Sequence, residues 1–213
     1  MKQKLTINAL VKEAKIFCEQ ESKFDNRDLF GITDGKAVGT FIEHKFQDYL
    51  SSNYEYLIGS SANGIDMPSE DLNTDIKVTS IKQPQSSCPF RNAKQKIYGL
   101  GYNLLVLVYD KNDDPTRKMS RLNFVSCSFI DKNRTADYQV TRTIRQMLEN
   151  NANADDIIAY LTDINLPTDE ILRNKPEQGY LTISNALQWR LQYGRIVELT
   201  ENVNGIIRII SKT

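Results

Sequence analysis

Six consecutive apolar residues, LLVLVY at positions 104–109, leave few folds open to this chain. A run of this length without polar alternation is typical of a strand that is buried on both faces of a sheet. An alternating, β-branched segment at residues 74–81 predicts a second strand, and residues 90–100 predict a helix between the two. A strand, a crossover helix and a strand make parallel neighbours, so the sequence predicts an α/β fold.

The other expected elements extend this pattern over residues 38–150 in the order α-β-β-β-α-β-β-α. Hydrophobic periodicity predicts helices at 3–22, 38–51 and 137–150, strands at 54–58 and 121–130, and an extended piece at 64–68. A polar break, NNANAD, begins at Asn150 and predicts a boundary between a domain of residues 1–150 and a subdomain of residues 151–213.

The segment after this break predicts three helices followed by two β-like runs around Asn-Val-Asn-Gly. The helices are expected at 155–162, 168–173 and 182–193. This order is that of a winged helix, and the fold class is therefore α/β with a small α+β subdomain. The alternative is a helical subdomain that serves dimerisation or braces the first domain.

Composition excludes several classes of protein. The chain has 213 residues with 27 basic and 27 acidic side chains, so bulk charge does not attract it to nucleic acid or membrane. It has no apolar run of membrane-spanning length and no signal peptide, so a cytoplasmic protein with three reduced cysteines is expected. Its single histidine, His44, and its lack of phosphate-binding glycine motifs exclude zinc fingers and a nucleotide cofactor. Any catalysis must therefore use carboxylates and lysines.

Four residues form a candidate catalytic group. Glu43 lies on an expected helix, Asp66 on a short extended piece, and Asp75 and Lys77 two residues apart on an expected strand. Residues at that spacing project from the same face of a strand. Mg²⁺ binds in proteins through one or two carboxylates, waters and substrate phosphate, so Asp66 and Asp75 are candidate metal ligands. Lys77 could then orient a water or stabilise charge on phosphorus.

A basic stretch follows the acidic residues. From Ile76 to Tyr109 the chain has no Asp or Glu but five basic residues, as a groove for a phosphate backbone would require. The candidate DNA-binding residues come from this stretch and from the last expected helix and its end: Lys82, Gln83, Gln85, Ser86, Arg91, Lys94, Arg190 and Arg195.

The ordered set Glu43, Asp66 and Asp75-x-Lys77, on the expected helix and strands, resembles the PD-(D/E)XK nuclease superfamily, and within it type II restriction endonucleases. The resemblance covers roughly residues 37–150. It implies a mixed central sheet flanked by helices, Asp66 and Asp75 as ligands of Mg²⁺, Lys77 as the catalytic lysine and Glu43 as an accessory acid. It also implies a homodimer that cleaves double-stranded DNA at short sequences.

Two other functions fit the same residues. One is a repair or recombination nuclease that recognises the structure of DNA. The other is a non-catalytic DNA-binding regulator that uses the C-terminal segment. Each site residue also has a structural interpretation: Asp66 in a turn before Pro68, Asp75 and Lys77 as ordinary strand residues, and Glu43 on the wet face of its helix.

Overall fold

The computed structural model describes residues 2–59, 64–82, 93–166 and 205–211, together with Phe90 and Thr168. The helices are α1 (Ile7–Glu21), α2 (Gly35–Asn53), α3 (Ala93–Tyr98), α4 (Tyr138–Glu149) and α5 (Ala154–Asp163), with a 3₁₀ helix at Lys132–Arg134. The strands are β1 (Gln3–Lys4), β2 (Asp25–Asn26), β3 (Tyr54–Glu55), β4 (Thr74–Ser80), β5 (Asn103–Asp114), β6 (Met119–Ile130) and β7 (Ile206–Ser211). Within these ranges no helix is long and apolar enough to cross a membrane.

These elements fall into two compact units. The first contains all the strands together with α1 and α2, and the second contains the 3₁₀ helix, α3, α4 and α5. The first unit carries every candidate catalytic residue, since Glu43 lies on α2, Asp66 precedes β4, and Asp75 and Lys77 lie on β4.

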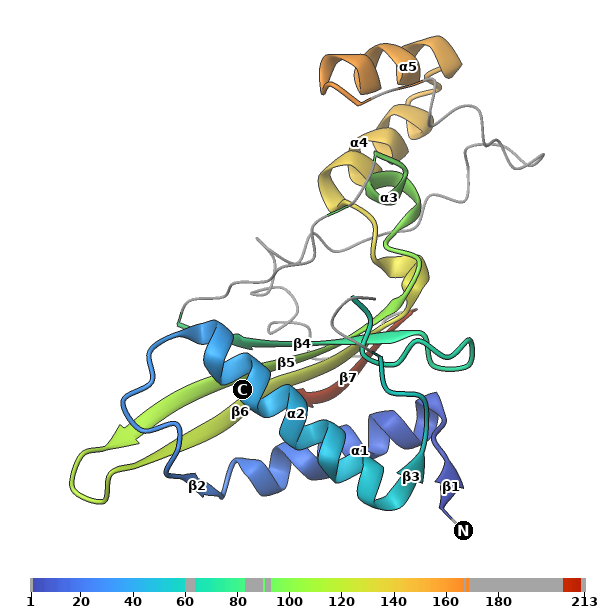
Figure 1. The fold of residues 1–213 in the computed structure, drawn as a ribbon. Coiled ribbons are helices and arrows are strands. Elements are labelled where there is room, and N and C mark those ends of the chain that lie inside the picture. The colour runs from blue at the N-terminus through green and yellow to red at the C-terminus, as the bar shows by residue number, and fades with distance from the viewer. Residues whose placement is uncertain are drawn as a thin grey trace. The chain divides into compact units, whose positions relative to one another are not determined.

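The first unit is built on a mixed sheet with the order β2-β6-β5-β4, and β7 also pairs with β6 (Figure 1). Strands β4 and β5 are parallel, which confirms the crossover predicted from the sequence. Strands β5 and β6 form an antiparallel hairpin, and β7 is antiparallel to β6. The predicted α/β class with a mixed central sheet is therefore confirmed.

Strand β5 passes through the middle of this sheet, as its apolar run predicts. Residues 104–108 are each at most 1% exposed, so both faces of the strand are covered. The pairing of β5 with β6 continues as far as Asp114 and Met119, so the polar residues 111–114 belong to β5. Hydrogen bonds between the two strands keep these polar residues extended where side-chain polarity alone indicates a loop.

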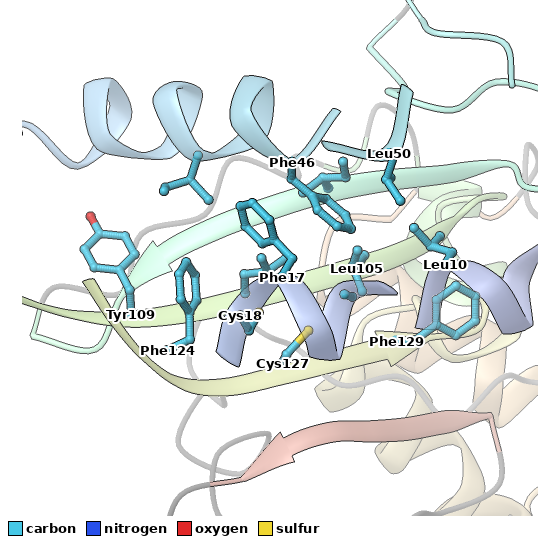
Figure 2. Packing of buried hydrophobic residues seen from close by; sticks show 14 of the residues in the cluster. Leu10, Phe17, Cys18, Phe46, Leu50, Leu105, Tyr109, Phe124, Cys127 and Phe129 are labelled. Atoms are coloured by element: carbon cyan, nitrogen blue, oxygen red, sulfur yellow. The ribbon is translucent and has the colours of Figure 1, made fainter. Parts of the chain in front are cut away.

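Helices α1 and α2 share one apolar core with the sheet. Figure 2 shows Phe17 of α1 and Phe46 of α2 near Phe124 and Leu105 of the strands. The rings of Phe17 and Phe46 lie 4.8 Å apart between centroids, which is a favourable distance for aromatic pairs. Cys18 and Cys127 are free buried thiols in this core, and Cys88 lies outside the described residues.

A buried ion pair also ties α2 to α1. The ammonium of Lys45 lies 2.8 Å from Oε2 of Glu21, and Glu21 is only 4% exposed. The same ammonium donates to Oδ1 of Asn26 at 3.0 Å and lies over the ring of Phe24. A buried charge needs such partners, so Lys45 fixes the position of α2 along the end of α1.

The C-terminal segment differs from the expected arrangement at its last strand. β7 pairs with β6 from Ser126↔Ser211 to Ile130↔Ile206, so it extends the central sheet and is not a wing of a separate module. A short apolar run shows that a strand forms, but not which edge it joins. The expected helix at 182–193 lies outside the described residues, as does all of the helix at 168–173 except Thr168.

The polar break at Asn150 joins two helices of the second unit. Ile144 of α4 shares an apolar cluster with Ile157 and Leu161 of α5 and with Ile97 of α3. The side chain of Asn153 caps α5 by accepting hydrogen bonds from the backbone of Asp155 and Asp156. The assignment of residues 151–213 as a separate subdomain stays a prediction, since most of that segment lies outside the described residues.

Candidate active site

A tight turn brings Asp66 and Asp75 together. The backbones of Met67 and Thr74 exchange two hydrogen bonds, each 3.0 Å long, which closes the chain between them. Asn73 adopts a left-handed conformation in this turn (φ 36°), and its N–H donates to the carbonyl of Ser69 at 2.7 Å. Asparagine tolerates that conformation better than most residues. The two aspartates flank the closed pair and therefore become neighbours.

The edge of the sheet explains how Asp66 is held. Strand β4 is the terminal strand on its side of the described sheet, so alternate N–H groups of β4 point away from β5, and that of Ile76 is one of them. Oδ2 of Asp66 accepts a hydrogen bond from that N–H at 2.7 Å. Oδ1 of Asp66 accepts a second hydrogen bond, from Nε2 of Gln47 at 3.2 Å. Asp66 thus occupies the edge position that a further strand would otherwise take.

Asp75 and Lys77 lie side by side on β4, as their spacing predicts. Nζ of Lys77 is 2.7 Å from Oδ2 of Asp75. The side chain of Asp75 is 5% exposed and that of Lys77 is 20% exposed. The pair is therefore largely withdrawn from water, and its charges interact more strongly than they would on the surface.

Burial and like charge raise the pKa values of two carboxyl groups here. The pKa of Asp75 is raised to about 7 by burial and by its hydrogen bond with the carboxyl group of Asp66, while Lys77 opposes the shift. Burial, and then the negative charge of Asp66, raise the pKa of Glu43, while Lys77 and His44 lower it. Glu43, Asp66, Asp75 and Lys77 thus form one electrostatically coupled group.

Helix α2 reaches the site because it packs closely on β4. At Gly39 an added Cβ would lie 3.5 Å from the carbonyl oxygen of Val78, so a small residue stands where helix and strand approach. Glu43 and Gln47 follow Gly39 at intervals of four residues and lie along the same side of the helix. This side of α2 therefore places Glu43 and Gln47 near Asp66 and Asp75.

The donor set fits Mg²⁺ better than a structural zinc ion. Asp66 and Asp75 supply two carboxylates, and among the described residues no group of three or more His, Cys, Asp and Glu is arranged to hold a metal. Structural zinc needs four protein ligands, whereas Mg²⁺ keeps several waters and takes substrate phosphate as a ligand. Burial is the main cause of the raised pKa of Asp75, and a divalent cation beside it would favour its charged form.

Only two of the predicted DNA-binding residues lie in the described part of the chain. Nζ of Lys82 is 3.0 Å from Oδ1 of Asp110, and both side chains are partly or largely exposed. Lys94 lies on α3 in the second unit. The remaining candidates are outside the described residues: Gln83, Gln85, Ser86, Arg91, Arg190 and Arg195.

Sequence reasoning missed Gln47. Its position four residues after Glu43, on the helix face that approaches β4, is the signal that could have identified it. A glutamine has no charge and matched no motif, so the spacing alone did not point to a role.

Comparisons with known proteins agree with the nuclease interpretation. The fold and the site define an α/β protein with an acidic, lysine-containing centre, and both matches found describe type II restriction enzymes. Residues 4–208 match the family model described as type II restriction enzyme NspV. The type II restriction enzyme NspV of Nostoc sp. is 54% identical to this chain, and the match covers 96% of each of the two chains. No solved structure matches the chain.

The chain therefore belongs to the NspV family of type II restriction enzymes and is a sequence-specific DNA endonuclease. This identity confirms the predicted function and enzyme class. It favours the restriction enzyme over the repair nuclease and the non-catalytic regulator that the sequence had left open.

Proposed function

We propose that this restriction enzyme is Mg²⁺-dependent and cleaves double-stranded DNA with a PD-(D/E)XK-type centre. The proposed centre consists of Asp66 and Asp75 as metal ligands, Lys77 as the catalytic lysine and Glu43 as an accessory acid. The observation that carries the proposal is the position of Asp75. Its carboxylate lies 2.7 Å from the ammonium of Lys77, and burial and the adjacent Asp66 raise its pKa to about 7.

The proposed roles follow from the position of each side chain. Mg²⁺ bound by the two aspartates would polarise the scissile phosphodiester and lower the pKa of a bound water. Asp66 presents its carboxylate from the sheet edge, where the N–H of Ile76 orients it. Lys77 keeps its ammonium beside Asp75, where it can donate to a phosphate oxygen or to the attacking water. Glu43 interacts electrostatically with Asp66 and Lys77. It can therefore accept a hydrogen bond from a water held near these two residues.

DNA contact is proposed to follow the basic stretch after β4. The side chain of Lys82 is largely exposed beside the less exposed Asp110, so its ammonium is accessible to a phosphate of the DNA backbone. Gln83, Gln85, Ser86 and Arg91 follow Lys82 in the sequence and lie outside the described residues. We keep them as proposed contacts together with Lys94, Arg190 and Arg195.

Assembly and location remain part of the proposal. Two-fold symmetric proteins suit two-fold symmetric DNA sites, so we propose a homodimer. The restriction-endonuclease fold rests on the family resemblance of Glu43, Asp66, Asp75 and Lys77. A cytoplasmic location is proposed because the three cysteines are expected to be reduced.

The first experiment is cleavage of unmethylated phage DNA by the purified protein in Mg²⁺ or in EDTA. Discrete fragments that form only with Mg²⁺ are expected. Asp66→Asn and Asp75→Asn should each abolish cleavage, because each removes a negative metal ligand with almost no change of shape. Asp48→Asn, at an exposed position of the same helix that carries Glu43, should cut at the wild-type rate. Wild-type cleavage by Asp75→Asn would show that the site has been assigned to the wrong residues.

A further inference from the structure

We propose that Gln47 is a positioning residue for the metal site: its side-chain amide holds the carboxylate of Asp66 in the orientation that metal binding requires. The inference rests on the proposed function, since it takes Asp66 to be a metal ligand. Gln47 would act through Asp66 and would touch neither the metal nor the DNA.

The two oxygens of Asp66 are held from two different elements. Gln47 of α2 donates from Nε2 to Oδ1 at 3.2 Å, and the backbone of Ile76 in β4 donates to Oδ2 at 2.7 Å. Asp66 itself belongs to no helix or strand, so its carboxylate depends on these donors for its direction. With the bond from Gln47 removed, Oδ1 of Asp66 loses its donor on α2, and the carboxylate is less firmly held in this orientation.

The chemistry of the amide explains why glutamine suits this position. An ionised carboxylate accepts hydrogen bonds and donates none, so the NH₂ group of Gln47 must face Asp66. Glutamine supplies this donor without a charge. A lysine or arginine here would neutralise Asp66 and compete with a metal ion, whereas glutamine leaves the negative charge of the site available.

Gln47 is itself held in place on α2. Its side chain is half-buried, and its backbone carbonyl accepts a hydrogen bond from the hydroxyl of Tyr56 at 3.2 Å. The next residue on its N-terminal side, Phe46, is completely buried in the core beneath the helix. The amide is therefore attached to a backbone that is held in place. A side chain that orients another side chain needs such support.

Side chains that hydrogen-bond to metal ligands typically change metal affinity by about 10–100-fold when they are removed. We therefore expect Gln47→Met to raise the Mg²⁺ concentration for half-maximal cleavage by about tenfold or more. Methionine matches glutamine in length and helix propensity but carries no donor. Cleavage at saturating Mg²⁺ should fall much less, because the ligands Asp66 and Asp75 remain.

The measurement is a Mg²⁺ titration of the cleavage rate with the full-length protein, together with Mn²⁺ binding followed by the electron paramagnetic resonance signal of free Mn²⁺. Gln20→Met is the matched control, since Gln20 is an exposed glutamine of α1. It should leave both curves unchanged. Gln47→Leu provides a second variant without a donor. Urea unfolding of the Gln47 variants is measured alongside, because a partly unfolded population would itself weaken the apparent metal affinity.

The outcomes separate this inference from the proposed function. If Asp75→Asn abolishes cleavage while Gln47→Met and Gln47→Leu keep the wild-type Mg²⁺ and Mn²⁺ curves, the positioning role is overturned and the metal site stands. If Asp75→Asn cleaves normally, the metal site itself is wrong. A shift in both metal curves for the two Gln47 variants, with none for Gln20→Met, supports the role of Gln47.

Discussion

Lys77 and Asp75 form an ion pair within a single strand, with Nζ of Lys77 2.7 Å from Oδ2 of Asp75. Lys77 opposes the rise in the pKa of Asp75, so Lys77→Met should raise that pKa further and weaken metal binding. We expect single-turnover cleavage to fall by at least about 100-fold, the usual size of a lost catalytic donor. DNA binding measured in EDTA by gel mobility should change little. Lys12→Met, at an exposed site on α1, is the control, and equal cleavage by the two variants would contradict the assignment.

The raised pKa of Asp75 predicts that the metal-free protein loses stability as pH rises. The pKa of Asp75 is about 7 in the folded chain and 3.8 for an unperturbed carboxyl, so the folded state holds its proton more tightly. The resulting stabilisation is complete below about pH 4 and is lost as pH rises to about 7, an effect on the order of a few kcal/mol at most. Urea unfolding in EDTA at pH 5 and pH 8 measures the change. Asp75→Asn should show a smaller difference between the two pH values, and parallel behaviour of both proteins would refute the prediction.

The parts of the site that depend on local periodicity could be predicted from the sequence. Asp75 and Lys77 are two residues apart, and strand geometry alone places them on one face. The apolar run at 104–109 similarly predicts a strand buried on both faces, and residues 104–108 are buried as expected. These features require only the identity of neighbouring residues.

The features that depend on distant pairing could not be predicted in this way. The hydrogen bond from Gln47 to Asp66 exists because the turn closed by Met67 and Thr74 returns Asp66 to the edge of β4 beneath α2. The pairing of β7 with β6 joins Ser126 to Ser211 across a long stretch of chain. No short-range pattern specifies either contact. The free energy that stabilises these contacts depends on strand edges and surfaces that form only when the sheet is assembled.

Gly59 is expected to be essential to the position of Asp66. Its N–H donates to the carbonyl of Asp66 at 2.7 Å, and a Cβ at this position would overlap the carbonyl oxygen of Ile65. Gly59→Ala must therefore displace the backbone beside Asp66, at a cost of about 1–3 kcal/mol. Cleavage should fall by at least about tenfold, because an ångström of misplacement at a catalytic group can cost about 100-fold. Gly35→Ala is the control: a Cβ there meets nothing within 4 Å, so cleavage and urea stability should be kept or slightly improved.

Phe46 is expected to connect the core to the site, since it is fully buried on α2 between the positions of Glu43 and Gln47. Its ring lies 4.8 Å from that of Phe17, so Phe46→Ala would leave a cavity where α2 meets α1. Truncation of a buried phenylalanine typically costs about 3–5 kcal/mol, and urea unfolding should show a loss of that size. Phe46→Leu keeps the position apolar and should cost less than half as much. If Phe46→Ala lost under about 1 kcal/mol, α2 would not be anchored by this core, and its role in delivering Glu43 and Gln47 would need another explanation.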